Sequence, residues 1–328
     1  MERLNDNVIW CILEEQKQKN SRNSLAPNTV KLYTTGLRHY IRFCREINTN
    51  LLPLNEVILE NFCVALSSRV RAKSIKNYLC GIQLFASING DAARIKDMVK
   101  VHYVIRGVKR SQGAWHKRPP KAPITFAQLK CILAHISTFV SVHNKYMMSA
   151  AVLTAFFGLL RVSEYTTDSP HIYDPLVHLC LNDVSINFHR QLLLVTIKAS
   201  KTDPFREGMQ IRLTATNHHL CPVTAMVRFL AVRGQQQGPL FRFENGRFLT
   251  RSHVTAISKV CFPGVVTIST HSFRRGGASA LAASGVPQYV IQIMGRWRSD
   301  AFLRYVELPD TFFSNTFVNM AHTADHPP

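Results

Sequence analysis

The chain has 328 residues, of which 46% are hydrophobic, and a formal net charge of +20 at pH 7. This length predicts two domains, each large enough to bury its own core. No apolar run approaches the roughly 20 residues that a membrane helix needs. The first ten residues carry acids and lack a secretory signal, so we expect an intracellular protein without a membrane partner.

The positive charge is the strongest signal in the composition. No acidic residue occurs between Asp97 and Glu164, or between Glu244 and Asp300. A solvated basic surface usually keeps acids interspersed, so these acid-free stretches favour a polyanionic partner, most often nucleic acid. The eight cysteines stand singly, with no CxxC pair, and no cluster of carboxylates accompanies the histidines. We therefore expect buried free thiols and neither a metal site nor a cofactor.

Residues 1–108 predict a small all-helical domain, with helices at 4–20, from Pro27, at 55–68 and at 74–88. Basic residues concentrate where the last of these helices begins. Helix starts favour anions because free N–H groups and the helix dipole point outward there. The prediction is an edge that grips phosphates, with a plain solvated face as the alternative. Its residues are Arg69, Arg71, Lys73 and Lys76.

Residues 109–123 predict an extended basic linker, because the helical pattern dissolves into RGVKRSQGAWHKRPPKAP. Glycine and proline alternate there with cations that suit a nucleic-acid backbone. KRPPK also matches the short basic type of nuclear address, so we expect a nuclear protein if the host is eukaryotic. The linker residues expected to contact DNA are Lys109, Arg110, Lys117, Arg118 and Lys121.

Residues 124–310 predict a second domain that mixes helices with strands. Thr125 and Gln128 have the spacing of a capping box. The helix over Ala150 to Leu160 is apolar on nearly all sides, which predicts burial, and it ends in Arg161-Val162-Ser163-Glu164. β-Branched residues between 177 and 215 predict a small antiparallel sheet, followed by helices at 223–232 and 249–260.

The stretch from Thr270 to Tyr305 holds the densest group of candidate site residues. His271 and Arg274 are spaced i and i+3, which places both on one face of a helix. Two glycines, an apolar helix and a second helix led by Pro287 follow, and Tyr305 comes eight residues after Trp297. A histidine, an arginine, an indole and a tyrosine on successive short helices predict a site for phosphate chemistry.

This stretch, THSFRRGG through GRWRSDAFLRY, resembles the C-terminal half of the tyrosine recombinase catalytic domain, the family of phage integrases and of Cre- and Xer-type recombinases. GRWRSDAFLRY is most similar to the recombinases of DIRS, Ngaro and Crypton elements. The resemblance implies a mainly α fold: an all-helical core-binding domain, then a mixed α+β catalytic domain with a small antiparallel sheet. It also implies a C-terminal tail at 311–328, binding to double-stranded DNA, and assembly into a tetrameric synapse.

The resemblance further assigns roles to single residues. Arg161 matches the first catalytic arginine and Glu164 the acid that follows it, while His271 and Arg274 match the second motif. In the family a hairpin lysine protonates the leaving 5′ oxygen; Lys201 matches it best, and Lys198 is the alternative. Trp297 stands where many relatives have a second histidine, and its indole N–H can donate to a phosphate but cannot act as a base.

Tyr305 matches the nucleophile, although its spacing departs from the usual interval of nine residues after the Trp/His position. Tyr289 is a rival by residue type. A tyrosine that holds the phosphate as an ester conserves the bond energy, so rejoining requires neither a metal nor ATP. Two arginines, Arg161 and Arg274, suit the non-bridging oxygens, where charge concentrates in the transition state.

The sequence leaves two alternatives to a site-specific recombinase or integrase of a mobile element. A type IB topoisomerase-like enzyme shares the chemistry and relaxes strands. A domesticated DNA-binding protein would have lost turnover, but the set of catalytic residues is intact. A Ser or Cys hydrolase is unsupported, because no GxSxG motif occurs.

Overall fold

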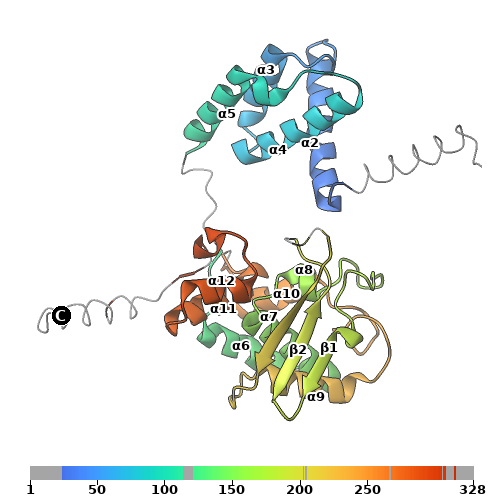
Figure 1. Ribbon diagram of the computed structural model, residues 1–328, viewed down its shortest axis with the longest axis vertical. Helices are drawn as coiled ribbons and strands as arrows, with labels where there is room; N and C mark the ends of the chain where they lie inside the picture. The colour runs from blue at the N-terminus through green and yellow to red at the C-terminus, as the bar shows by residue number, and fades with distance from the viewer. Residues whose placement is uncertain are drawn as a thin grey trace, which may run out of the picture. The chain divides into compact units, whose positions relative to one another are not determined.

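The computed structural model describes residues 24–113, 121–201, 203, 205–265, 267–304, 306–307 and 314. The chain divides into two compact units, Met1–Arg118 and Pro119–Pro328. Both are drawn in Figure 1, and each is described below by itself.

The first unit is helical throughout its described part. Three helices confirm the prediction from Pro27, at 55–68 and at 74–88, while the predicted helix at 4–20 lies outside the described residues. Asn55 caps the second of them, where its side chain accepts hydrogen bonds from two backbone N–H groups. The elements are α2 (Pro27–Glu46), α3 (Glu56–Ser67), α4 (Ala72–Ile88), the short 3-10 helix η1 (Ile95–Asp97) and α5 (Val99–Gln112).

Helix α5 corrects the predicted start of the linker, because Lys109 and Arg110 lie in its last turn. Its apolar face is buried in the core of this unit. Its last residue, Gln112, accepts a hydrogen bond from the Ala72 N–H at 2.9 Å and donates to the carbonyl oxygens of Ser67 and Val70. These contacts hold the basic stretch in a helix, and they are between residues about 40 positions apart, which local sequence patterns do not report.

The second unit begins with a helix whose N-terminus has the predicted capping box. The Thr125 side chain accepts a hydrogen bond from the Gln128 backbone N–H, and the Gln128 side chain accepts one from the Thr125 backbone N–H. Its elements are α6 (Phe126–Ser137), α7 (Val142–Phe157), α8 (Val162–Tyr165), η2 (Leu181–Asp183), β1 (Val184–Asn187), β2 (Leu192–Ile197), β3 (Met209–Thr214), α9 (Pro222–Arg233), α10 (Arg251–Cys261), α11 (His271–Ala283), α12 (Gln288–Gly295) and η3 (Asp300–Arg304).

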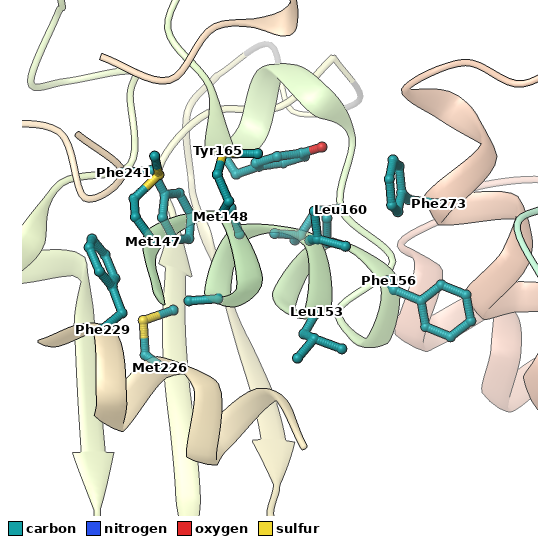
Figure 2. Packing of buried hydrophobic residues seen from close by; sticks show 14 of the residues in the cluster. Met147, Met148, Leu153, Phe156, Leu160, Tyr165, Met226, Phe229, Phe241 and Phe273 are labelled. Carbon is teal, nitrogen blue, oxygen red and sulfur yellow. The ribbon is translucent and has the colours of Figure 1, made fainter. Parts of the chain in front are cut away.

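Helix α7 lies at the centre of this unit, as its all-round apolarity predicts. Nine of its side chains are buried; α7 packs against α6, α9 and α11, and its buried residues share one core cluster with those of the sheet. Figure 2 shows Met147 and Met148 facing Met226, Phe229 and Phe241 at one end of this core. At the other end α11 supplies Phe273. The core thus joins the helix that precedes Arg161 to the helix that carries His271.

The sheet confirms the predicted small antiparallel arrangement, with the strand order β1-β2-β3. Leu193, Val195 and Ile197 of β2 are buried in alternation, so one face of the sheet packs on the helices. Figure 1 shows the three strands side by side, with β2 in the middle. None of the helices in the described ranges is both long and apolar enough to cross a membrane.

Candidate active site

The approach of α11 to the end of α7 builds the site. It depends on two glycines: a Cβ on Gly276 would lie 2.2 Å from the Ile124 carbonyl oxygen, and one on Gly277 would lie 2.2 Å from that of Phe156. Any larger residue would clash with backbone. Because α11 begins at His271, this contact brings the His271 and Arg274 turn to the segment between α7 and Arg161.

Arg161 and Glu164 form one hydrogen-bonded unit at the start of α8. The Arg161 Nη1 donates to Glu164 Oε1 at 2.7 Å, and the Arg161 backbone N–H donates to Oε2 at 2.8 Å. The Glu164 side chain has no exposed surface, while that of Arg161 is 13% exposed. A buried carboxylate therefore holds an arginine that still reaches the surface.

Arg274 lies deeper. It has no exposed surface, and it donates through Nη1 to the carbonyl oxygen of Leu159 and through Nη2 to that of Gly295. The ring of Trp297 covers the guanidinium, with Cζ 4.2 Å from the ring centroid, a cation–π contact. The structure thus places Trp297 against Arg274, whose side chain has no exposed surface.

His271 is half-buried among arginines. Burial, together with the charges of Arg274 and Arg161 and, to a smaller degree, Arg275 and Arg251, lowers the pKa of His271 to about 4. The imidazole is therefore neutral at physiological pH, so it can accept a proton. A bound phosphate would oppose the arginines and raise this pKa.

Besides Arg275, two further cations of this site were missed by the sequence analysis. Arg251, at the start of α10, is exposed and close enough to act on the His271 pKa. Arg296 binds Glu164 at 2.7 Å. Arg296 stands within the quoted GRW motif, so its charge was visible, but nothing local distinguishes its role from that of the neighbouring Trp297. Arg251 belongs to no motif.

The β2–β3 hairpin carries Lys201, whose side chain is exposed. A cavity of about 390 Å³ separates this hairpin from the end of α12; Ser200, Glu207, Arg296 and Trp297 are among its lining residues. The alternative, Lys198, is held in an ion pair, with Nζ 2.6 Å from Asp183 Oδ2. The geometry therefore leaves Lys201 as the lysine that can reach outward from the hairpin.

Tyr305 lies outside the described residues, but the chain on both sides of it is anchored. Phe302 is 3% exposed and packs against Leu159 and Ala278. The Glu307 backbone N–H donates to Ser279 Oγ at 2.9 Å, and its carboxylate lies 3.5 Å from Arg275 Nη2. Of these contacts Ala278, Ser279 and Arg275 are on α11, the helix that carries His271 and Arg274.

The rival tyrosine lies elsewhere on the fold. Tyr289 is 66% exposed in the first turn of α12, whereas the Gly295 carbonyl that Arg274 binds is at the other end of that helix.

The predicted phosphate-gripping residues of the first unit are on its surface: Arg69, Arg71, Lys73 and Lys76 are all exposed. The Ala72 N–H of α4 is taken by Gln112, so this helix start offers fewer free donors than expected. Lys121 is half-buried, and Lys117 and Arg118 lie outside the described residues.

A second basic stripe, absent from the predictions, runs along α2. Its exposed members are seven, four and three residues apart, which places them on one helical face; they are Lys31, Arg38, Arg42 and Arg45. In the parts of the chain that the structure describes, no cluster of three or more His, Cys, Asp or Glu side chains has the arrangement of a metal site.

No protein-family model and no curated protein sequence matches the chain. Solved structures do. The XerH site-specific recombinase, in a post-cleavage complex with its difH substrate, matches with a TM-score of 0.61 and 17% identity over 94% of this chain and 83% of that one. The Tn1549 transposon integrase bound to transposon right end DNA matches with a TM-score of 0.59 and 15% identity, covering 93% of this chain and 98% of that one. A lambda integrase dimer on a core site matches with a TM-score of 0.52 and 11% identity, covering 90% and 76%.

At these identities the likeness concerns the fold. The chain has the mainly helical fold of tyrosine recombinases, with the predicted three-stranded antiparallel sheet in its second unit.

Proposed function

We propose that this protein is a site-specific DNA recombinase or integrase that cuts and rejoins strands through a 3′-phosphotyrosyl intermediate on Tyr305. The observation that carries the proposal is the convergence of Arg161, His271 and Arg274, with the chain around Tyr305 anchored on the same helix as two of them. The fold shared with DNA-bound integrases and recombinases supports it.

In the proposed reaction the Tyr305 oxygen attacks the phosphorus and the bond to the 5′ oxygen breaks. The tyrosine proton passes to a base, a role for His271 once the bound phosphate has raised its lowered pKa, and Lys201 supplies a proton to the leaving 5′ oxygen. Arg161 and Arg274 hold the non-bridging oxygens. The phosphotyrosyl ester keeps the bond energy, so a 5′ hydroxyl can reverse the step without a metal or a nucleotide.

Because Arg274 has no exposed surface beneath Trp297, the proposal includes a movement of that ring when DNA binds. The sequence has three tryptophans, and replacing Trp10 and Trp115 by Phe leaves Trp297 as the single tryptophan. Its fluorescence should change on binding of a duplex. An unchanged spectrum at saturating DNA would contradict the movement.

The finer parts of the proposal rest on the GRWRSDAFLRY resemblance and on charge. We propose a mobile-element enzyme that binds double-stranded DNA through both basic units and assembles into a tetrameric synapse, in the nucleus if the host is eukaryotic. The exposed cations of the α2 stripe and of Arg69 to Lys76 supply phosphate contacts, so affinity should fall by roughly one log unit per log of salt for each contact.

Covalent trapping tests the proposal. Wild-type protein incubated with a nicked suicide substrate in EDTA should give an adduct that survives SDS. Tyr305→Phe should bind DNA normally and form none, because only the nucleophilic oxygen is lost, while Tyr289→Phe should form it normally.

An adduct that persists in Tyr305→Phe would move the nucleophile elsewhere. No adduct with wild type on any substrate, including its own element ends, would favour the DNA-binding protein without turnover. Relaxation of supercoiled plasmid without strand exchange would favour the topoisomerase-like alternative.

A further inference from the structure

Glu164 is the most completely buried acid of the site, and it serves two arginines. Its side chain has no exposed surface. Oε1 accepts from Arg161 Nη1 at 2.7 Å, and Oε2 accepts both from the Arg161 backbone N–H at 2.8 Å and from Arg296 Nη2 at 2.7 Å. The three side chains therefore form one contiguous group, with the carboxylate in the middle.

Arg296 is committed to this group by its own position. It follows the last residue of α12 in a left-handed conformation, with φ 56° and ψ 42°, and its side chain is 6% exposed. Nη1 donates to the Gly158 carbonyl oxygen and Nη2 to that of Leu159, both at 3.1 Å. Its terminal nitrogens are thus directed at the protein rather than outward.

Arg161 differs from Arg296 because its guanidinium keeps donors and exposed surface that a ligand can reach. Among the described residues its guanidinium donates to Glu164 through Nη1 alone, and its side chain is more exposed than that of Arg296. If Glu164 had Arg161 as its one partner, the pair would be neutral and would attract a phosphate weakly. Arg296 brings a second positive charge, so the group of three keeps a net charge of +1.

The burial of the Arg296 guanidinium indicates that its contact with Glu164 is needed to keep it charged. Burial lowers the pKa of Arg296, and the Glu164 carboxylate opposes that effect. A buried cation is costly unless its partners compensate for the lost water. Here the compensation links three segments: the end of α7, the start of α8 and the end of α12.

We propose that Arg296 is a positioning residue that acts through Glu164: it shares the carboxylate, fixes the Arg161 guanidinium and leaves the Arg161 charge for the scissile phosphate. This inference rests on the proposed function. It assigns to Arg296 a role separate from that of Trp297 in the same motif, although the two residues are adjacent.

The test compares Arg296→Gln with Arg298→Gln, an exposed arginine two residues further on. On a phosphodiester suicide substrate Arg296→Gln should form the covalent adduct about 100-fold more slowly, since small displacements of a catalytic group have effects of that order. Arg298→Gln should cleave at close to the wild-type rate, with any change confined to DNA affinity.

The decisive readout uses a substrate with a methylphosphonate at the scissile position, which has no charge for Arg161 to neutralise. Arg161→Ala and Arg296→Gln should both recover on it, with the same preference for one methylphosphonate diastereomer. A purely structural defect would slow both substrates equally. The double variant Glu164→Gln/Arg296→Gln gives a second test. Without Arg296 the Glu164 carboxylate neutralises Arg161 alone, so removing that carboxylate should also remove the Arg296→Gln defect.

If Arg296→Gln does not fold, Arg296→Lys replaces it in the experiment. It keeps the charge but has no planar fork to span the acceptors, so an intermediate rate with the same recovery is expected. Wild-type cleavage rates in the folded variants, or defects that methylphosphonate leaves unchanged, would overturn the inference while wild type still forms the Tyr305 adduct. If wild type itself forms no adduct, the proposed function fails instead.

Discussion

The buried arginines and the lysine of the β2–β3 hairpin hold their positive charges in opposite environments. Arg274 and Arg296 have almost no exposed surface, and their terminal nitrogens donate to backbone carbonyl oxygens and, from Arg296, to a buried carboxylate. Lys201 is exposed on a turn whose main internal support is Asp203, which accepts from the Glu207 and Gly208 N–H groups.

The difference follows from what each group has to do in the proposed reaction. Groups that stabilise developing charge work best when they are preorganised and pay no reorganisation cost during the step. A proton donor has to reach an oxygen on a DNA strand, so it belongs on an accessible loop. Variants of the buried arginines should therefore affect stability and activity together, whereas variants of Lys201 should affect activity alone.

The largest effect is expected for Arg274→Ala. It leaves the Gly295 carbonyl oxygen without its donor and removes one of the two donors to the Leu159 carbonyl oxygen, which should lower the free energy of unfolding by about 2–4 kcal/mol. Adduct formation should fall by at least ~100-fold. Urea unfolding and covalent trapping measure the two effects, with Arg298→Ala as the exposed control. Wild-type stability in the variant would contradict the buried-anchor interpretation.

Lys201→Ala should slow cleavage by roughly 100-fold or more through loss of the proton donor. The free energy of unfolding should change by less than about 0.5 kcal/mol, because the side chain is exposed. A substrate with a 5′-bridging sulfur leaves without a proton and should restore the rate. If Lys198→Ala shows this recovery and Lys201→Ala does not, the assignment within the hairpin is wrong.

Gly277→Ala tests the helix contact that assembles the site. The new Cβ would lie 2.2 Å from the Phe156 carbonyl oxygen, so α11 must shift away from α7. We expect a loss of about 1–3 kcal/mol in the free energy of unfolding and a parallel loss of cleavage. Gly107→Ala is the matched control, since nothing lies within 4 Å of its Cβ position. Equal effects of the two substitutions would argue against the close packing.

The smallest effect concerns pH. The unfolded His271 binds a proton below its ordinary pKa of 6.5, but the folded one does so only near a pKa of about 4. Its contribution to stability is therefore complete above 6.5 and is lost as the pH falls from 6.5 toward 4. In His271→Asn the free energy of unfolding should fall by roughly 1–2 kcal/mol less than in wild type over this pH range, allowing for solvent screening of a half-buried group. Identical pH profiles of unfolding would contradict the lowered pKa.

Much of the fold could be predicted because its signals are local. The apolar run before Arg161, the capping box at Thr125 and the β-branched residues of the sheet each depend on neighbours within a few residues, and all three elements appear as expected. Helix α5 was missed although Val101, Val104, Ile105 and Val108 have the spacing of an amphipathic helix and pack in the core. Its last turn was assigned to the linker because Lys109 and Arg110 adjoin the basic segment that is rich in Gly and Pro.

The sequence by itself determined the kinds of residue at the site, since the spacing of His271 and Arg274 and the charge of the GRW motif are written locally. Only the tertiary structure decided what each one contacts. Arg296 meets Glu164 across 132 residues, and Arg274 meets the Leu159 carbonyl across 115. Whether a cation faces a phosphate or a buried partner depends on the helices packed around it, and no local pattern encodes that environment.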